Sequence, residues 1–415
     1  MEHRQLFSIA DYGAIGDGHT LNTAAIQAAV DACAGSGGGT VVFPKGVFLS
    51  GTIRMRGGIT YLLERGAVLR GSGSLADYTD NGFYHNELGL VVSLLWARDE
   101  EDIRITGDGK IDFSARDFFA GSRIISPVPD ESLLTPEQRA EAVLEIRPRP
   151  NQPIFFESCR DITIDGVTLL DSPCWTITCS RSRRIQIHHI TVRNSLIVPN
   201  CDGIHLSACK DVIVGDCLFE CGDDCVAVTC ITAEGQEDIS ERILISRCHM
   251  RSRSAAVRLG HLKGKVRHVV VSDLVITDSN RGLAVFSGDE GYVEDALCTN
   301  ITMETRIVAG VWWGKGEAAV ICAAGSSGHI RDITLQNIRA RSEAGVLLAG
   351  TDGNVRDVTL RDIDLRLVKG SNDTLFGGDL DFRPNLFLKG AADISQGVYA
   401  EGVENLTTEN VRIQG

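Results

Sequence analysis

Three aspartates near the middle of the chain have the types and spacing that acid–base chemistry needs. Asp202 stands just before the short apolar segment 203–206, and Asp223 and Asp224 stand just before segment 225–228. Carboxyl groups that lie close together raise the pKa of at least one of them, which suits a general acid. The remaining carboxylates can hold and activate a water. This set predicts hydrolysis of a glycosidic bond with inversion, provided that the carboxyl groups lie roughly 6.5–9.5 Å apart.

These carboxyl groups meet only if the two segments are neighbouring strands, and a repeat along the chain predicts that they are. A pattern of apolar, any, apolar, any, any, apolar recurs at intervals mostly near ~25 residues with no helix between copies, which is typical of a solenoid. A β-propeller would need blades of about forty residues, and the regular Leu and Asn of leucine-rich repeats are missing. A parallel β-helix fits best. The repeated middle positions are Ile164, Ile187, Val214, Ile245, Val271, Cys298, Leu335, Leu360 and Thr408.

Aligning the coils on this repeat predicts two columns of side chains on one face. The first column stands just before the short strands and contains Asp202, Asp224, Ala255 and Arg281. The second lies three positions on and contains His205, Ala227, Arg258 and Ala284. Positions 204 and 226 alternate inward as core. Segment 222–224 alone would be typical of a solvated turn, but three aspartates that converge beside two arginines favour a site.

The rest of the chain is expected to serve this solenoid. An Ala-rich segment at about residues 22–34, with Asn22 and Thr23 as its N-cap, predicts a helix that covers the open N-terminal end. The polar stretch 127–150 predicts a long loop or short helix, and residues of about 366–400 predict a long loop region. The prediction is therefore one all-β domain over residues 1–415, a parallel β-helix with an N-terminal capping helix.

The composition disfavours several classes of partner. The 41 Lys+Arg and 55 Asp+Glu give a net charge of −14, which argues against nucleic acid and anionic membrane surfaces. It also disfavours a polyanionic substrate unless the site has its own basic cluster. No apolar run approaches the roughly 18 residues of a membrane span, and no signal peptide is visible.

The 13 cysteines form no CxxC pair and mostly stand in strand-like contexts. This usage predicts buried free thiols in a reducing cytoplasm. Zinc binding by Cys217, Cys221 and Cys225 is disfavoured, because their spacing of four comes with no nearby pair of histidines. We expect no metal site and no organic cofactor.

The motifs around the aspartates resemble glycoside hydrolase family 28, the polygalacturonases. Segment 200–203, Asn-Cys-Asp-Gly, is similar to the family's Asn-Thr-Asp-Gly, and segment 222–225, Gly-Asp-Asp-Cys, is a second match. Segments 11–18, 38–44 and 172–175 resemble stretches that mark the fold.

The resemblance implies a right-handed parallel β-helix that cleaves galacturonosyl linkages with inversion. It also implies roles for four residues. Asp223 would be the general acid, Asp202 and Asp224 would position and deprotonate the attacking water, and Asn200 would support the site.

Two departures from the family pattern concern basic residues. Ala255 stands where the family has the His of Gly-His-Gly. The family's Arg-Ile-Lys, which reads the substrate carboxylate, is replaced after Arg281-Gly282 by Leu-Ala-Val-Phe at 283–286. The basic residues expected to compensate as substrate-binding groups are Arg258, Arg281, His261, Lys263 and Lys315.

Each of these assignments has a plainer alternative. Arg258 could instead be an ordinary surface arginine paired with an acidic neighbour. His205 is expected either to orient Asp202 or to be an outward polar residue of a strand. Trp313 is expected to stack on a sugar ring, and packing in the core is its alternative.

We therefore expect a hydrolase of pectin-type or related oligosaccharides. The missing signal peptide indicates an imported oligomer as substrate and favours exo action. Two other classes stay open. A polysaccharide lyase would need calcium-binding carboxylates, or another charge neutraliser, and a base such as Arg258; Asp202, Asp223 and Asp224 would then be metal ligands. In a non-catalytic carbohydrate-binding β-helix, Ala255 would mark a decayed site.

Overall fold

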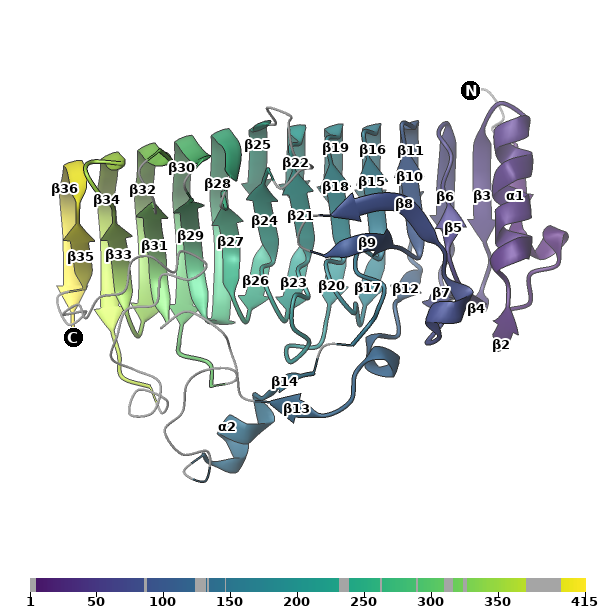
Figure 1. Ribbon diagram of the computed structural model, residues 1–415, viewed down its shortest axis with the longest axis horizontal. Helices are drawn as coiled ribbons and strands as arrows, with labels where there is room; N and C mark the ends of the chain where they lie inside the picture. The colour runs from purple at the N-terminus through teal and green to yellow at the C-terminus, as the bar shows by residue number, and fades with distance from the viewer. Residues whose placement is uncertain are drawn as a thin grey trace.

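Two long parallel sheets, in which each strand pairs with the strand one coil away, run the length of the molecule (Figure 1). This computed structural model describes residues 5–85, 88–123, 132, 134–145, 147–230, 239–261, 263–288, 290–309, 316–323, 327–370 and 397–415. The repeated apolar positions stack in register, as Ile187 on Val214 and Val214 on Ile245, and their side chains are buried. The all-β parallel β-helix that the repeat predicted is confirmed.

The smaller of the two long sheets, which we call the site sheet, has eleven strands. They are β5 (Ile53–Arg54), β10 (Leu95–Arg98), β15 (Ile154–Glu157), β18 (Ile177–Ser180), β21 (Ile204–Ser207), β24 (Val226–Thr229), β27 (Ala255–Leu259), β29 (Arg281–Ser287), β31 (Glu317–Ala323), β33 (Gly345–Ala349) and β35 (Val398–Glu401).

The larger sheet, with 21 strands, forms the remaining wall of the coil. Its strands are β1 (Leu6–Ser8), β2 (Asp17–Leu21), β3 (Gly39–Phe43), β4 (Gly46–Ser50), β6 (Ile59–Leu63), β7 (Ala67–Gly71), β11 (Glu101–Thr106), β12 (Lys110–Asp112), β16 (Arg160–Asp165), β17 (Thr168–Leu170), β19 (Arg183–His188), β20 (Thr191–Arg193), β22 (Lys210–Gly215), β23 (Leu218–Cys221), β25 (Ile239–Ser246), β26 (His249–Ser252), β28 (Lys263–Ser279), β30 (Glu290–Thr305), β32 (His329–Ser342), β34 (Val355–Leu367) and β36 (Val403–Gln414).

A residue with left-handed backbone angles bends the larger sheet at the same place in successive coils. The φ angles are 56° at Asp161, 53° at Arg184, 59° at Asp211 and 56° at Arg242. Asp and Asn tolerate this conformation better than most residues, which explains part of the chain's abundance of them. Opposite charges alternate along this ladder, so Arg184 pairs with Asp161 and Arg242 pairs with Asp211.

The N-terminal end of the coil is covered by helix α1 (Thr23–Gly35), which follows the short helix η1 (Ile9–Tyr12) (Figure 1). Its buried face contains Ile26, Ala29, Val30 and Cys33. Asn22 is the N-cap residue of this helix, as predicted, but its side chain makes no capping hydrogen bond. Asn22 is buried, and its Oδ1 accepts a hydrogen bond from the backbone N–H of Ile15 at 2.7 Å, so the preceding turn uses that oxygen.

Two excursions leave the coil beside the site sheet. The hairpin of β8 (Asp80–His85) and β9 (Gly89–Val92) follows the short helix η2 (Leu75–Asp77) and crosses over the site sheet (Figure 1). The second excursion lies between β12 and β15 and contains η3 (Ala115–Phe118), β13 (Ser122–Arg123), α2 (Pro136–Ala140) and β14 (Val143–Leu144).

Some expected loops lie partly outside the described residues. Within the stretch 127–150, the described part contains α2, which begins with a capping box between Thr135 and Gln138. Of the expected loop region at about 366–400, residues 371–396 lie outside the described residues, and β34 ends at Leu367.

All 13 cysteines are buried free thiols. In the part of the chain that the structure describes, no helix has the length and apolar character to cross a membrane.

Candidate active site

A small cavity of about 80 Å³ opens where β21, β24 and β27 begin. It is lined by Trp175, Asn200, Asp202, Asp223, Asp224, Ser254, Ala255, Arg258, His261, Arg281 and Phe286. The register along the site sheet is the predicted one, because His205 pairs with Ala227, Ala227 with Arg258, and Arg258 with Ala284. The structure therefore brings all three aspartates into one cavity.

Two glycines explain why the aspartates come so close to their neighbours. A Cβ atom at Gly222 would lie 2.2 Å from the carbonyl oxygen of Val198, and one at Gly203 would lie 2.5 Å from that of Cys225. Only glycine permits this approach of the coils. The loop that ends at Asn200 is thereby packed directly against the segment that carries Asp223.

The three carboxyl groups are buried, with exposed fractions of 2% for Asp202, 6% for Asp223 and 1% for Asp224. Asp224 accepts a hydrogen bond from the backbone N–H of Ala255 at 2.9 Å and forms an ion pair with Arg258. Asp223 accepts a hydrogen bond from the backbone N–H of Asp224 at 2.9 Å. The Asp223 carboxyl also contacts the side chain of Ser254.

Burial and mutual repulsion favour the protonated forms of two of these groups. Burial, together with the charge of Asp224, raises the pKa of Asp223 to about 7, although Arg258 acts in the opposite direction. Burial and the charges of Asp223 and Asp224 also raise the pKa of Asp202 well above its usual range. The cluster therefore holds a proton near neutral pH, and this is the property a general acid needs.

His205 contacts Asp202, as one of its two interpretations expected. Its Nδ1 lies 3.2 Å from Asp202 Oδ2, and its Nε2 lies 2.9 Å from the Thr229 hydroxyl. The imidazole is stacked on Trp175, with 3.7 Å between ring centroids. Burial, followed by the charge of Arg258, lowers the pKa of His205 well below its usual value. A neutral His205 thus holds Asp202 in place.

Arg258 belongs to the cavity and is paired within it. Its Nε contacts Asp224 Oδ2, and its Nη1 lies 3.2 Å from His261 Nδ1. Burial acts to lower the pKa of Arg258, but Asp224 and Asp202 outweigh it and raise the pKa. Arg258 is therefore not an ordinary surface arginine, since its side chain is 12% exposed, lines the cavity and is paired with a carboxylate of the site. Its substrate-binding role stays a prediction.

The other basic candidates differ in position. Arg281 lines the cavity wall but is buried, with its Nε 3.3 Å from Glu317 Oε2. Lys263 is not among the cavity residues. It begins β28 of the larger sheet, is exposed and pairs with Glu290 at 3.0 Å. Trp313 and Lys315 lie outside the described residues.

Sequence reasoning missed three features of this site. Trp175 was taken only as a mark of the fold, yet it forms a wall of the cavity, and its place just before β18 was the available signal. Phe286 stands where the family has a basic residue and lines the cavity with its ring. Arg149, from the second excursion, is buried and donates to Asn200. Nothing in its local sequence pointed to this position.

The β8–β9 hairpin covers the site sheet on the N-terminal side of the cavity. Phe83 packs on Phe155 with ring centroids 5.3 Å apart, and His85 meets Trp175 edge-on at 5.0 Å. On the other side of the cavity, the outward positions of the sheet are apolar and buried. They include Ala284, Phe286, Val320 and Leu347.

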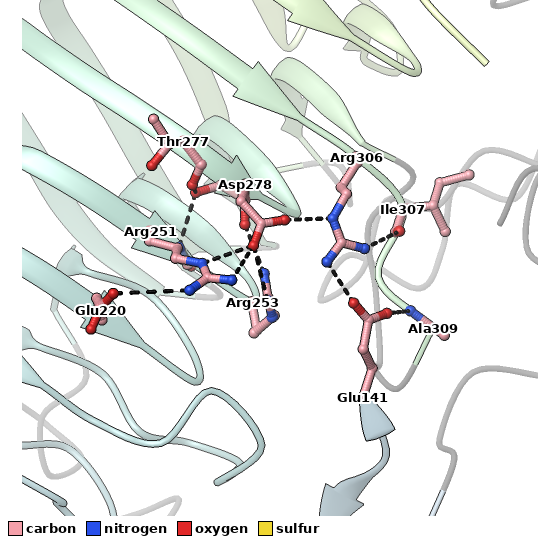
Figure 2. Close-up of polar contacts among 11 residues, drawn as sticks. Glu141, Glu220, Arg251, Arg253, Thr277, Asp278, Arg306, Ile307 and Ala309 are labelled. Carbon is pink, nitrogen blue, oxygen red and sulfur yellow. Dashed lines mark hydrogen bonds and ion pairs between the residues drawn. The ribbon is translucent and has the colours of Figure 1, made fainter. Parts of the chain in front are cut away.

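A charged network connects the second excursion to the coil (Figure 2). Asp278 forms ion pairs with Arg251, Arg253 and Arg306, and Arg306 also pairs with Glu141 at the end of α2. Burial acts to raise the pKa of Asp278, but Arg253 and Arg306 outweigh it and hold the pKa at about 2. The network therefore joins α2 to the strand that leads into Ser254 and Ala255.

Comparison with known proteins identifies relatives of the chain. The family model described as Glycosyl hydrolases family 28 matches residues 138–375. A Vitis vinifera protein named "Probable polygalacturonase" is 30% identical over 325 residues, which cover 72% of this chain and 60% of that protein. The "Exo-poly-alpha-D-galacturonosidase" of Dickeya chrysanthemi is 25% identical over 82% of this chain and 63% of its own length. The chain thus spans about three fifths of these curated relatives.

Solved structures share the fold. The exopolygalacturonase of Thermotoga maritima matches with a TM-score of 0.71 and 20% identity, over 99% of this chain and 92% of that one. The polygalacturonase of Erwinia carotovora matches with a TM-score of 0.67 and 18% identity, over 100% and 98% of the two chains. These matches confirm the right-handed parallel β-helix. Since the family model covers more than half of the chain and includes its aspartate motifs, the protein belongs to the family Glycosyl hydrolases family 28.

Proposed function

We propose that this protein hydrolyses glycosidic bonds in pectin-type oligosaccharides by a single displacement with inversion. The observation that carries the proposal is the buried group of three aspartates, in which the pKa of Asp223 is raised to about 7. Family membership and the names of the relatives support galacturonosyl linkages as the substrate.

Each aspartate has a defined task in this reaction. Asp223 donates its proton to the glycosidic oxygen, so the leaving sugar departs as a neutral alcohol. Asp224, held by Arg258, and Asp202, held by His205, position a water on the opposite side of the sugar ring. The water attacks the anomeric carbon, and the carboxylate of Asp224, which is paired with Arg258, accepts the proton that the water loses. The glycosidic C–O bond breaks as the bond to the water oxygen forms, and the two aspartates only donate and accept protons.

We further propose that the enzyme acts on chain ends. The hairpin covers the site sheet on one side of the cavity through Phe83 and His85. A chain that continued past the cavity at the hairpin would have no place on this face. Digestion of a long galacturonan should release products of one short length from the outset. A ladder of intermediate lengths at early times would contradict exo action.

A substrate screen tests the proposed activity. Galacturonosyl, rhamnogalacturonan and neutral oligosaccharides are incubated with the protein, and new reducing ends and the absorbance of unsaturated sugars are both recorded. Hydrolysis gives reducing ends without unsaturated product, and a chelator leaves it unchanged. Elimination would give unsaturated sugars, and binding without any product would favour a carbohydrate-binding protein. The pairing of Arg258 with Asp224 disfavours elimination, because that arginine is not available as a base over a sugar carbon.

We also propose that the protein works in a reducing compartment such as the cytoplasm. The 13 buried free thiols support this, since an oxidising compartment favours paired cysteines. Fractionation of cells that express the full-length protein tests it, and recovery outside the cytoplasm would contradict it.

A further inference from the structure

Both arginines that line the cavity are already paired with carboxylates, so a uronic acid needs another cation. Three carboxyl groups face the cavity, and the guanidinium of Arg258 is engaged by one of them, Asp224. The second lining arginine, Arg281, faces Glu317. If the substrate is the uronide of the proposed function, on which this inference rests, its carboxylate needs a further positive charge close to the cavity.

Arg149 is a buried cation with few partners beside the cavity. Its exposed fraction is 9%, and its guanidinium lies 5.3 Å from the ring centre of Phe119. Nη2 makes three long contacts, 3.4 Å to the carbonyl oxygen of Pro199, 3.4 Å to Asn200 Oδ1 and 3.5 Å to Cys174 Sγ. Nε and Nη1 are buried and have no hydrogen-bond acceptor among the described residues.

This arrangement is costly unless an anion completes it. A buried charge is usually paired and fully hydrogen-bonded, since an isolated one loses its hydration without compensation. The contacts of Arg149 within the described residues are two neutral oxygens and a sulfur, and none is a carboxylate. The missing charge must therefore come from outside the part of the chain that the structure describes, and the adjoining cavity is where a substrate enters.

Asn200 connects Arg149 to the cavity. It lines the cavity, and its Oδ1 accepts from Arg149, which leaves the amide N–H groups as the donors it can offer a ligand. Its backbone is fixed as well, with a φ of 56° and its loop packed against Gly222. The segment that carries Arg149 is also hydrogen-bonded to this loop: the backbone N–H of Leu144 donates to the carbonyl oxygen of Ile197 at 2.8 Å.

We propose that Arg149 and Asn200 together recognise the carboxylate of a uronosyl residue. Asn200 donates a hydrogen bond to the carboxylate, and Arg149 acts as a positioning residue that orients the Asn200 amide and supplies positive charge from behind it. This pair takes the place of the two basic residues that are lost at Ala284 and Phe286.

Arg149→Gln tests the proposal on two matched substrates, an acidic galacturonate oligomer and its methyl-esterified, uncharged form. KM for the acidic oligomer should rise about tenfold or more, and kcat should stay within about threefold of the wild-type value. The reason is that the lost interaction stabilises the bound substrate and the transition state equally. KM for the ester should change little. Arg149→Lys keeps the charge and should recover part of the loss. Arg147→Gln, an exposed arginine two residues away, should behave as the wild type.

Binding measured without turnover separates this inference from the proposed function. Calorimetry is done with variants that also carry Asp223→Asn. Arg149→Gln should weaken the binding of the acidic oligomer and leave the binding of the ester unchanged, whether or not the wild type hydrolyses either. Equal weakening of both ligands would show a purely structural role and overturn the proposal, as would unchanged binding of the acidic oligomer. Thermal melting of Arg149→Lys and Arg149→Gln shows whether both variants are folded.

Discussion

At the scale of residues, the positive charge of one arginine, Arg258, acts on all three carboxyl groups of the site. Arg258 pairs with Asp224 directly, and its charge also lowers the pKa values of Asp202 and Asp223 against their burial. Asp223 must be protonated to act as the acid, so activity should decline as the pH rises through about 7.

The first prediction concerns this pH dependence. In Arg258→Gln, the pKa of Asp223 should rise because the opposing positive charge is gone, so the alkaline limb of kcat/KM should move to higher pH. The maximal rate should fall, roughly 100-fold, because Asp224 loses the group that holds it. The pH profile of kcat/KM for wild type and variant measures both effects. An alkaline limb that stays in place would show that Arg258 does not control the acid.

The second prediction concerns the buried pair of Arg281 and Glu317, which have exposed fractions of 1% and 0%. Glu317→Gln removes the carboxylate that faces Arg281 and should lower the free energy of unfolding by about 3–5 kcal/mol. Glu290→Gln breaks the exposed pair with Lys263 and should change it little. Denaturant unfolding of both variants makes the comparison. Equal effects would show that burial does not decide the strength of these pairs.

At the scale of elements, α2 and its neighbours depend on Asp278, on which three arginines converge (Figure 2). The pKa of Asp278 is lowered to about 2, so its stabilising contribution is fully present above the unfolded value near ~4 and is lost as the pH falls toward 2.

The third prediction is that Asp278→Asn loosens α2 without unfolding the coil. Three arginines would lose their shared carboxylate, and the contact of Arg306 with Glu141 would lose its anchor. Amide hydrogen exchange should increase in residues 134–145 and stay unchanged in β3 and β6, which lie near the N-terminal end of the larger sheet. Asp216→Asn, which breaks an exposed ion pair with Arg247, serves as the control. Exchange that rises equally along the whole coil would contradict this prediction.

Elements also show where sequence reasoning stops. The columns from His205 to Ala284 were predictable, because a period of two within strands and a repeat between coils fix the register. The excursions were not, because they lack a repeat. The hairpin that carries His85 and the segment that carries Arg149 reach the cavity through tertiary contacts with no local signature. The position of Lys263 was unpredictable for a related reason, since the repeat alone did not show that this residue begins β28 of the larger sheet.

At the scale of the whole molecule, the net charge of −14 poses a problem for any enzyme that binds a uronide. The solenoid distributes most of its charges along outer ladders, where opposite signs pair between coils, as in Asp211 with Arg242. The cavity is different, because its carboxyl groups are buried together. A substrate carboxylate therefore depends on local cations rather than on the overall field.

The central claim is that Asp223 is the acid of an inverting hydrolysis. The most direct measurement is NMR of the first product formed from a galacturonate oligomer by the wild type and by Asp223→Asn. We predict that the wild type releases product of inverted anomeric configuration and that the variant loses activity by about 100-fold or more, since its amide cannot donate the acid's proton. Product that retains its configuration, or an Asp223→Asn variant with the full hydrolytic rate, would contradict the account.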